Sequence, residues 1–339
     1  MVIAISQISE IKTIVERSRV LPLNQAQLQR QAIARMAHTS TSIEGNKLAQ
    51  FEVDKVLSGM SVNADAKSIL EVKNYQQALK KVEEIAELPG PITSKQILEL
   101  HRILMLGLLP KEKTGAYRPG DIYIVDDLGN GKEVLRFKGP DAKKVPYLIN
   151  ELLLWLNSKQ KIPPILKAAI FHLQFVTIHP FSDGNGRITR LLTNLILYKE
   201  NWDFRKIIVL EDYYNRDRLA YYNALNEVQG DKFHSGEDLT SWIDYFILGF
   251  LLEAKEVAKT ISSIGQDQIV SDEEQILLDR DEIKIIDLLA SSNKTTSSDI
   301  EKLLHIAKRT AQLKLKNLVD KKLIEVKGRG PSTFYTQKQ

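Results

Sequence analysis

The sequence predicts a mostly helical fold: an all-α core that carries one small β-hairpin, followed by a separate small C-terminal domain. Apolar residues recur at helical spacing through most of the chain, for example over residues 145–156. Two β-rich runs, 121–125 and 133–137, flank a Gly-Asn-Gly turn, which is typical of a hairpin. Near the C-terminus, three short helical runs precede a second hairpin at 323–335.

Composition excludes several classes of protein. The 339 residues suffice for two or three domains, and the absence of cysteine excludes disulfides, a thiolate nucleophile and a cysteine zinc site. The N-terminus lacks a basic segment followed by a long apolar one, so no signal peptide is expected. The longest apolar run, near residues 245–252, is too short to cross a membrane. We therefore expect a cytoplasmic protein with no membrane partner. The net charge of +4 is too small to indicate any other partner.

One dozen residues, 179–190, concentrate the polar chemistry of the chain. This stretch, His-Pro-Phe-Ser-Asp-Gly-Asn-Gly-Arg-Ile-Thr-Arg, lies between two apolar helical runs, so it predicts a loop that joins two buried helices. Gly184 and Gly186 can adopt backbone angles closed to other residues, and successive N–H groups in such a turn form a concave anion site. A helix that starts near Gly186 adds its positive end to that site.

The charged residues of this stretch suit a nucleotide phosphate. Arg187 and Arg190 share one helical face, where each planar guanidinium group donates two hydrogen bonds at once to phosphate oxygens. Asp183 is a hard oxygen ligand for Mg²⁺ that carries substrate phosphates, and His179 is a general base at neutral pH. Taken singly, a histidine is usually structural and a Gly-x-Gly is usually a turn. A turn does not need the base, the acid and both arginines, so the combination favours attack of a deprotonated group on a phosphate.

The stretch resembles the signature of the Fic (filamentation induced by cAMP) family, His-Pro-Phe-x-[Asp/Glu]-Gly-Asn-Gly-Arg-x-x-Arg, at every fixed position. The resemblance implies a mostly helical fold and transfer of AMP from ATP, with Mg²⁺, to a Ser, Thr or Tyr hydroxyl of target proteins and of the protein itself. It implies that His179 takes the hydroxyl proton, that Asp183 holds Mg²⁺ and that Phe181 anchors the loop in the core. The residues that it assigns to ATP and its phosphates here are Gly184, Asn185, Gly186, Arg187, Ile188, Thr189 and Arg190.

A second motif precedes the core. The run Ser40-Thr-Ser-Ile-Glu44-Gly45 places Ser40 and Glu44 on one helical face with Gly45 as a C-cap, which by itself describes an ordinary helix end with a solvated glutamate. The run resembles the inhibitory-helix motif [Ser/Thr]-x-x-x-Glu-[Gly/Asn] of the Fic class with an N-terminal inhibitory helix. The resemblance implies that Glu44 pairs with Arg190 and autoinhibits AMP transfer. In some relatives this glutamate also supports removal of AMP, which we keep as a second activity.

Three further segments resemble parts of a Fic core. The run that ends at Arg118 is similar to a Gly-x-Tyr-Arg segment, for which a structural role is favoured over a phosphate contact. The hairpin at 121–137 is either decorative or, as the resemblance implies, a flap that pairs with the backbone of an extended protein target. The adjacent Tyr221 and Tyr222 are either one core and one surface residue or, by resemblance, an adenine pocket with Gln229 near the edge of the base.

The C-terminal region is predicted to be a separate unit. A capping box at 298–301 opens the second of its three helices, and the three helices and hairpin resemble a winged helix-turn-helix. Residues 301–329 include nine basic and three acidic residues, so the basic third helix fits either a DNA major groove or a protein-docking module. That helix carries Lys308, Arg309, Lys314 and Lys316. The predicted domains are 1–92 (helical, with the inhibitory helix), 93–263 (the Fic core), 264–275 (a linker) and 276–339 (the winged helix).

Three functions compete at this point. The first is a protein adenylyltransferase. The second is a Fic variant that transfers another phosphate-containing group, which the intact Gly-Asn-Gly disfavours. The third is a nucleotide-sensing, DNA-binding regulator, against which the presence of both the base and the acid argues. In each case we expect a homo-oligomer, most simply a dimer.

Overall fold

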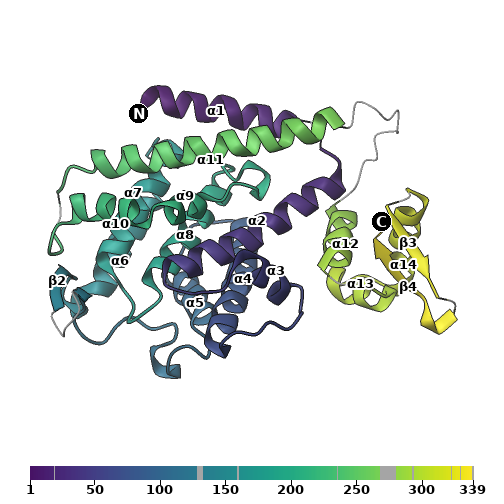
Figure 1. Cartoon of the computed structure of the whole chain (residues 1–339), viewed down its shortest axis with the longest axis horizontal. Helices are drawn as coiled ribbons and strands as arrows, with labels where there is room; N and C mark the ends of the chain where they lie inside the picture. Colours follow the sequence, from purple (N-terminus) through teal and green to yellow (C-terminus); the bar gives the residue numbers. More distant parts are fainter. Residues whose placement is uncertain are drawn as a thin grey trace. The chain divides into compact units, whose positions relative to one another are not determined.

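A computed structural model (Figure 1) describes residues 1–18, 20–127, 133–158, 160–234, 236–267, 280–291, 294–321, 323–328 and 330–337. The chain divides into two compact units, and each is considered by itself. Unit 1 comprises Met1–Glu16 and Ala32–Ala258, and unit 2 comprises Arg17–Gln31 and Lys259–Gln339. The predicted turn at 128–131 and most of the predicted linker at 264–275 lie outside the described residues.

Unit 1 is mostly helical with one hairpin, as the sequence predicts. The helices that contribute to it are α1 (Val2–Arg17), α2 (Pro22–Ile43), α3 (Gln50–Leu57), α4 (Ala66–Glu87), α5 (Ser94–Leu104), α6 (Val145–Leu156), α7 (Pro164–Ile178), α8 (Asn185–Lys199), α9 (Leu210–Arg216), α10 (Arg218–Gln229) and α11 (Thr240–Asp267), with short 3₁₀ turns η1 (Lys111–Lys113), η2 (Ala142–Lys144) and η3 (Phe204–Lys206). Within the described ranges, none of the helices is long and apolar enough to cross a membrane.

Helix boundaries in unit 1 follow local signals. Thr93 caps α5, because its hydroxyl accepts the Gln96 N–H at 3.3 Å while the Gln96 side chain accepts the Thr93 N–H at 2.8 Å. Helix α6 has the predicted bounds, and α7 begins at Pro164 as predicted. Proline is favoured in the first turn because the N–H that it lacks would have no helical partner there.

Helix α8 is the buried axis of unit 1. Every residue from Arg187 to Tyr198 is buried, and the helix packs against α4, α5 and α7. Polar groups on such a helix need partners inside the protein. The hydroxyls of Thr189 and Thr193 therefore donate to carbonyl oxygens one turn back, at 2.7 and 2.8 Å. The motif loop enters this helix at its N-terminus, so the loop is attached to the most constrained part of the unit.

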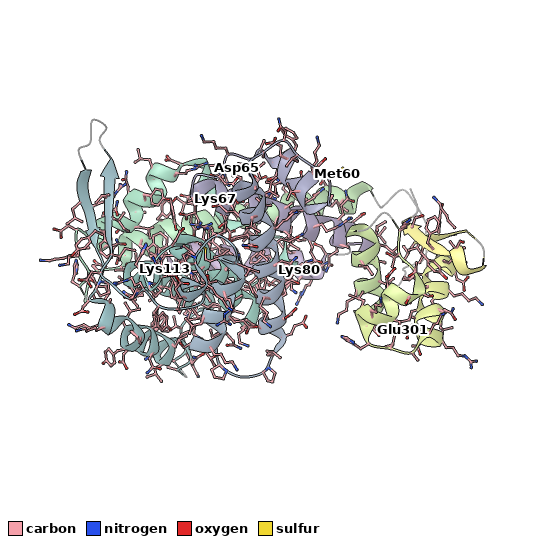
Figure 2. The ribbon with its side chains drawn as sticks, turned by 90° about the horizontal axis from the view of Figure 1, so that it is seen from below. Met60, Asp65, Lys67, Lys80, Lys113 and Glu301 are labelled. Atoms are coloured by element: carbon pink, nitrogen blue, oxygen red, sulfur yellow. The ribbon has the colours of Figure 1, made fainter. Side chains whose placement is uncertain are left out.

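The hairpin consists of β1 (Tyr123–Asp127) and β2 (Glu133–Lys138), which pair antiparallel with Val125 opposite Leu135. It projects from the body of unit 1 (Figure 2). Three apolar side chains on it are exposed: Tyr123 by 51%, Val125 by 41% and Leu135 by 49%. Exposed apolar residues on a two-stranded sheet are unfavourable for an isolated protein, so the hairpin has the character of a binding element.

Unit 2 contains three helices and a hairpin. These are α12 (Arg280–Ser291), α13 (Ser297–Leu304), α14 (Lys308–Asp320), the antiparallel strands β3 (Ile324–Lys327) and β4 (Phe334–Gln337), and the turn η5 (Gly330–Ser332). The core contains Ile285, Ile286, Leu289, Ile300, Ala311, Leu315, Leu318 and Ile324, together with Ala26 from α2. Helix α2 thus begins in unit 2 and ends in unit 1. The predicted domains instead placed all of 1–92 in one region.

One predicted detail of unit 2 is wrong. The capping box of α13 involves Thr296 and Asp299, not Ser298 and Glu301: the Thr296 hydroxyl accepts the Asp299 N–H at 3.3 Å, and the Asp299 carboxylate accepts the Thr296 N–H at 2.9 Å. The run Thr-Thr-Ser-Ser at 295–298 offers four residues able to cap a helix. The sequence therefore indicated the start of the helix to within two residues but not the residue that caps it.

Candidate active site

The motif loop joins α7 to α8. Helix α7 ends at Ile178, and His179 takes left-handed backbone angles (φ 50°, ψ 62°) that turn the chain out of the helix. Gly184 is also left-handed, with φ 81°, and α8 begins at the next residue. A Cβ at position 184 would lie 2.7 Å from the Met105 sulfur. Backbone angles and packing therefore both require glycine at position 184.

Phe181 and Asn185 hold the loop in shape. Phe181 is fully buried, as expected for an anchor. The Asn185 side chain accepts the Phe181 N–H at 2.9 Å and donates to the Phe181 carbonyl oxygen at 2.8 Å. The resemblance assigns Asn185 to the loop that cradles the phosphates, and its side chain fixes the shape of that loop.

His101 on α5 is a site residue that the sequence reasoning missed. Its ring stacks on Phe181 with centroids 3.7 Å apart. Its Nδ1 accepts the Gly115 N–H at 2.9 Å, so Nε2 carries the proton and donates to the Asp183 carbonyl oxygen at 3.1 Å. Burial lowers the pKa of His101 to about 4, which keeps the ring neutral. The only sequence signal was a histidine on the apolar face of a helix, which rarely indicates function.

The geometry of His179 suits a general base. Its Nδ1 donates to the Val176 carbonyl oxygen at 3.1 Å, which leaves the lone pair on Nε2. Burial lowers the pKa of His179 to about 4, so the imidazole is neutral at pH 7 and can accept a proton. Arg118 fixes the main chain here, because its Nε donates to the His179 carbonyl oxygen at 2.8 Å and its Nη2 to the Pro140 carbonyl oxygen at 2.5 Å. Arg118 is thus structural, as favoured from the sequence.

Arg190 is paired with the end of α2. Its Nη2 lies 2.7 Å from Glu44 Oε1 and 2.9 Å from the Ser40 carbonyl oxygen, and its Nε donates to the Ser40 hydroxyl at 2.7 Å. The predicted pairing of Glu44 with Arg190 is therefore present. Burial alone would lower the pKa of Arg190, but the carboxylate of Glu44 holds it above its ordinary value. A Cβ at Gly186 would overlap Glu44 Oε1, so this carboxylate lies over the first turn of α8.

Arg187 and Asp183 lie together beside the loop. Arg187 Nη2 is 3.1 Å from Asp183 Oδ1, and its Nη1 is 3.5 Å from Glu71 Oε1. Arg187 Nε and Nη1 are buried and make no hydrogen bond within the described residues, and Nη1 is the atom that faces Glu71. The Asp183 side chain is 53% exposed. No group of three metal-ligating side chains occurs in the described residues, so Mg²⁺ here would depend on Asp183 and phosphate oxygens, as in many nucleotide sites.

The predicted adenine residues are divided between core and surface. Tyr221 is buried, stacks on Tyr214 with centroids 4.5 Å apart, and shares a 3.0 Å hydrogen bond with His172 Nε2. Tyr222 is half-buried, and its hydroxyl donates to the Ile43 carbonyl oxygen at 3.4 Å, at the end of α2. The side chains of Ile188 and Thr189, also assigned to ATP, are fully buried in α8.

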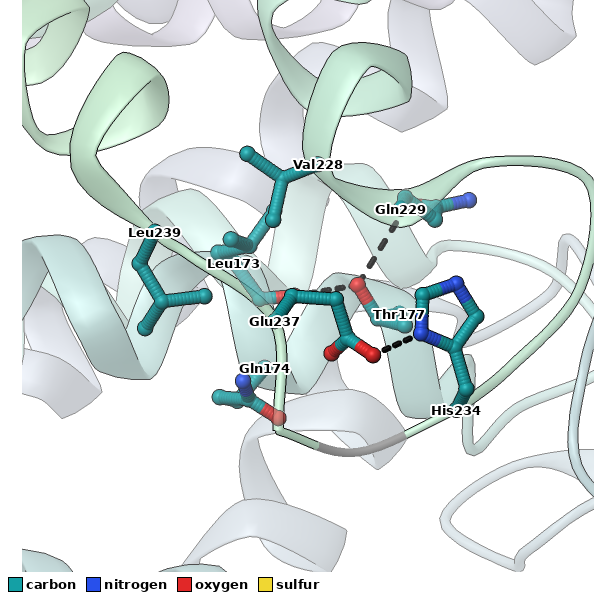
Figure 3. Close-up of a pocket in the computed structure, with 8 residues that line it drawn as sticks. All are labelled: Leu173, Gln174, Thr177, Val228, Gln229, His234, Glu237 and Leu239. Carbon is teal, nitrogen blue, oxygen red and sulfur yellow. Dashed lines mark hydrogen bonds and ion pairs between the residues drawn. The ribbon is translucent and has the colours of Figure 1, made fainter.

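Gln229 lines a small pocket with Thr177, and the His234 ring contacts the Glu237 carboxylate in the same lining (Figure 3). The Thr177 hydroxyl donates to Gln229 Oε1 at 3.4 Å. The pocket volume is about 10 Å³, which is room for about one water molecule. An adenine ring would therefore require side chains around Gln229 to move, and the base-binding role of this pocket stays a prediction.

Residues 91–197 match the model of the Fic/DOC family. This chain carries a Fic domain. It is 30% identical over 205 residues to "Protein adenylyltransferase Fic" of Aedes aegypti, which covers 59% of this chain and 38% of that protein. It is 31% identical over 197 residues to a probable protein adenylyltransferase of Aquifex aeolicus, which covers 56% of this chain and 53% of that protein.

The solved structures agree with the fold. The crystal structure of a Fic family protein from Desulfovibrio desulfuricans G20 matches with a TM-score of 0.62 and 25% identity, and the match covers 99% of this chain and 95% of that one. The chain spans less than two thirds of the length of the curated relatives above. The Fic domain is therefore established, while the activity of those relatives is a proposal for this chain.

The overlap between position 186 and Glu44 yields a first prediction. We expect Gly186→Ala to lower the melting temperature of the wild-type protein, because the new Cβ displaces the Glu44 carboxylate. In a Glu44→Gly background the same substitution should cost little, since alanine is favoured over glycine in a helix by up to about 1 kcal/mol. Thermal unfolding of the four proteins in this double-mutant cycle measures the coupling. Additive effects of the two substitutions would contradict the contact.

Buried His172 yields a second prediction. Burial lowers its pKa to about 3, so it stays neutral in the folded state while the unfolded chain takes up a proton near pH 6.5. Its contribution to stability is therefore full above pH 6.5 and is lost as the pH falls. Between pH 7.5 and pH 5, His172→Phe should lose about 2 kcal/mol less free energy of unfolding than the wild type. Urea titrations of both proteins test this, and parallel pH profiles would refute it.

Proposed function

We propose that the protein is an adenylyltransferase that moves AMP from ATP to Ser, Thr or Tyr hydroxyls of target proteins and of itself. One observation carries the proposal: a neutral histidine with a free Nε2 lies at the loop that opens the buried helix α8, beside two arginines. The histidine supplies the base. The helix N-terminus and the arginines supply an anion site. These are the two requirements for attack on a phosphate. The names of the Fic relatives support the same reaction.

In the proposed mechanism, Nε2 of His179 takes the proton of the target hydroxyl. The hydroxyl oxygen forms a bond to the α-phosphorus of ATP, the bond from that phosphorus to the α–β bridging oxygen breaks, and pyrophosphate leaves. The main chain of the loop and the guanidinium groups of Arg187 and Arg190 stabilise the charge on the phosphates. Asp183 would hold Mg²⁺, which supplies further positive charge to the phosphates.

The contact between Glu44 and Arg190 supports autoinhibition. The carboxylate pairs with a guanidinium that the mechanism assigns to the polyphosphate, and it lies over the positive end of α8. ATP and Glu44 therefore compete for the same positive charge, and ATP bound beside Glu44 would be displaced from the geometry for in-line attack. Displacements of about 1 Å lower such rates about a hundredfold. We propose that the same carboxylate, by orienting water, supports removal of AMP as a second activity.

Incorporation of label from α-labelled ATP tests this proposal. With Mg²⁺ present, we expect Glu44→Gly to label itself and added protein about a hundredfold or more faster than wild type, because Arg190 becomes free for phosphate. Glu44→Gly/His179→Ala should incorporate nothing, since it lacks the base. Glu87→Gly, which removes an exposed glutamate from α4, is the matched control and should behave as wild type.

The other outcomes separate the alternatives. Equal labelling of wild type and Glu44→Gly would contradict autoinhibition while leaving the transfer intact. Label from γ-labelled but not from α-labelled ATP would identify a phosphotransferase. No label from either position would favour the nucleotide-sensing regulator.

A second function is favoured by the surface of α14. Lys308, Arg309 and Lys316 are exposed on this helix, whereas Lys314 pairs with Asp281 at 3.1 Å. We propose that unit 2 is a winged helix-turn-helix whose helix α14 contacts DNA phosphates. Of the four cations that the sequence places on this helix, Lys314 therefore has a carboxylate partner within unit 2.

Salt dependence of DNA binding tests this role. We expect affinity for duplex DNA to fall steeply with salt, and Lys308→Glu/Arg309→Glu to lower the slope of log K against log salt by about two, because two phosphate contacts are lost. Lys67→Glu/Lys80→Glu, on exposed positions of α4 (Figure 2), makes the same change in net charge and should leave the slope unchanged. No binding at low salt would assign unit 2 to protein docking.

A further inference from the structure

A basic groove lies at the base of the hairpin in unit 1. Its wall begins where β2 ends, because the Lys138 N–H donates to the Asp231 carbonyl oxygen at 2.8 Å and the Phe233 N–H donates to the Lys138 carbonyl oxygen at 2.9 Å. These bonds bring the segment after α10 beside the start of α6. The groove has a volume of about 710 Å³ and is lined by Lys138, Gly139, Pro140, Asp141, Lys143, Lys144, Tyr147, Leu148, Lys232 and Phe233.

The charge of this groove is strongly positive. Four of its lining residues are exposed lysines, at positions 138, 143, 144 and 232, and within the part of the chain that the structure describes none forms an ion pair with a carboxylate. Asp141 is the one acidic residue in the lining, and its carboxylate accepts the Lys143 N–H at 2.8 Å as the cap of η2. Tyr147, which is 63% exposed, adds an apolar surface beside the charges.

The groove is fixed next to the candidate base. Pro140, in the groove wall, and His179 accept hydrogen bonds through their carbonyl oxygens from the same guanidinium group, that of Arg118. The Arg118 side chain is buried, so this link is rigid. A peptide whose hydroxyl lies at His179 therefore has the groove wall beside it, on the other side of Arg118.

We propose that this groove binds an acidic segment of the protein target, close in sequence to the hydroxyl that receives AMP. The inference rests on the proposed transfer reaction and adds a class of target to it. Four lysines that form no ion pair among the described residues complement Asp and Glu side chains, and one of them, Lys138, also lies over the Tyr123 ring at 5.6 Å. Such complementarity sets partner choice and association rate. The adjoining hairpin, with its exposed apolar side chains, favours a peptide over a nucleic acid as the occupant, because a strand edge pairs with peptide backbone.

Peptide binding by the full chain tests the groove without using catalysis. The probes are fluorescein-labelled dodecapeptides with one central threonine and flanks of Asp and Glu, of Asn and Gln, or of Lys and Arg, measured by anisotropy at low salt. We expect the acidic peptide to bind best, and we expect Lys143→Glu/Lys144→Glu to lower the affinity for this peptide about tenfold or more. Lys67→Glu/Lys80→Glu should leave the affinity for the acidic peptide unchanged. Equal weakening by both variants, or equal binding of all three peptides, would overturn the proposal.

Two further arms separate the alternatives. A single-stranded oligonucleotide that binds more tightly than the acidic peptide, and loses affinity in Lys143→Glu/Lys144→Glu alone, would reassign the groove to nucleic acid. Transfer from α-labelled ATP by Glu44→Gly to the peptides should follow the order of binding, and the groove variant should raise KM for the acidic peptide. Selective binding of the acidic peptide without any transfer would refute the proposed adenylyltransferase activity and support the groove. Transfer without a preference for the acidic peptide would support the activity and refute the groove.

Discussion

The charge of Arg190 is the constraint on which the candidate site depends. The guanidinium is buried in unit 1, and its partners are Ser40 and Glu44 at the end of α2. A buried cation that loses its counter-charge destabilises a protein by about 3–5 kcal/mol. An anion beside position 190 therefore stabilises the folded protein. In this structure the anion is the Glu44 carboxylate, and in the proposed reaction it is a phosphate of ATP. The proposed inhibition and the proposed catalysis therefore differ in which anion pairs with Arg190.

The location of Glu44 also favours its carboxylate in the proposed competition with ATP phosphate for Arg190. Its carboxylate lies against Gly186 in the first turn of α8, where the helix itself favours a negative charge. The backbone also fixes its location, because α2 ends at Ile43 and Gly45 turns the chain with φ 95°. A glutamate on a backbone fixed in this way loses less conformational entropy on pairing than a glutamate on a flexible segment. The contact between Glu44 and Arg190 therefore forms at a lower entropic cost, and in the proposed reaction a phosphate takes the place of the carboxylate.

The sequence predicted the parts of the site that are continuous in the chain. The loop at 179–190 and the bounds of the helices beside it followed from glycine, proline and apolar spacing. The pairing of Glu44 with Arg190 came from a motif resemblance alone, because no spacing rule relates residues 146 apart. His101 and the basic groove escaped prediction because each depends on tertiary contacts. Residue 232 joins residues 138–148 only through the main-chain bonds at the end of β2.

Helix α2 connects the inhibitory contact to a unit that takes no part in the proposed chemistry. Ala26, near its start, belongs to the core of unit 2, and Ser40, near its end, binds Arg190 in unit 1. Because helix formation is cooperative, packing at Ala26 also stabilises the helical conformation that positions Ser40. A ligand of unit 2 can alter inhibition only to the extent that it binds one state of α2 more tightly than the other.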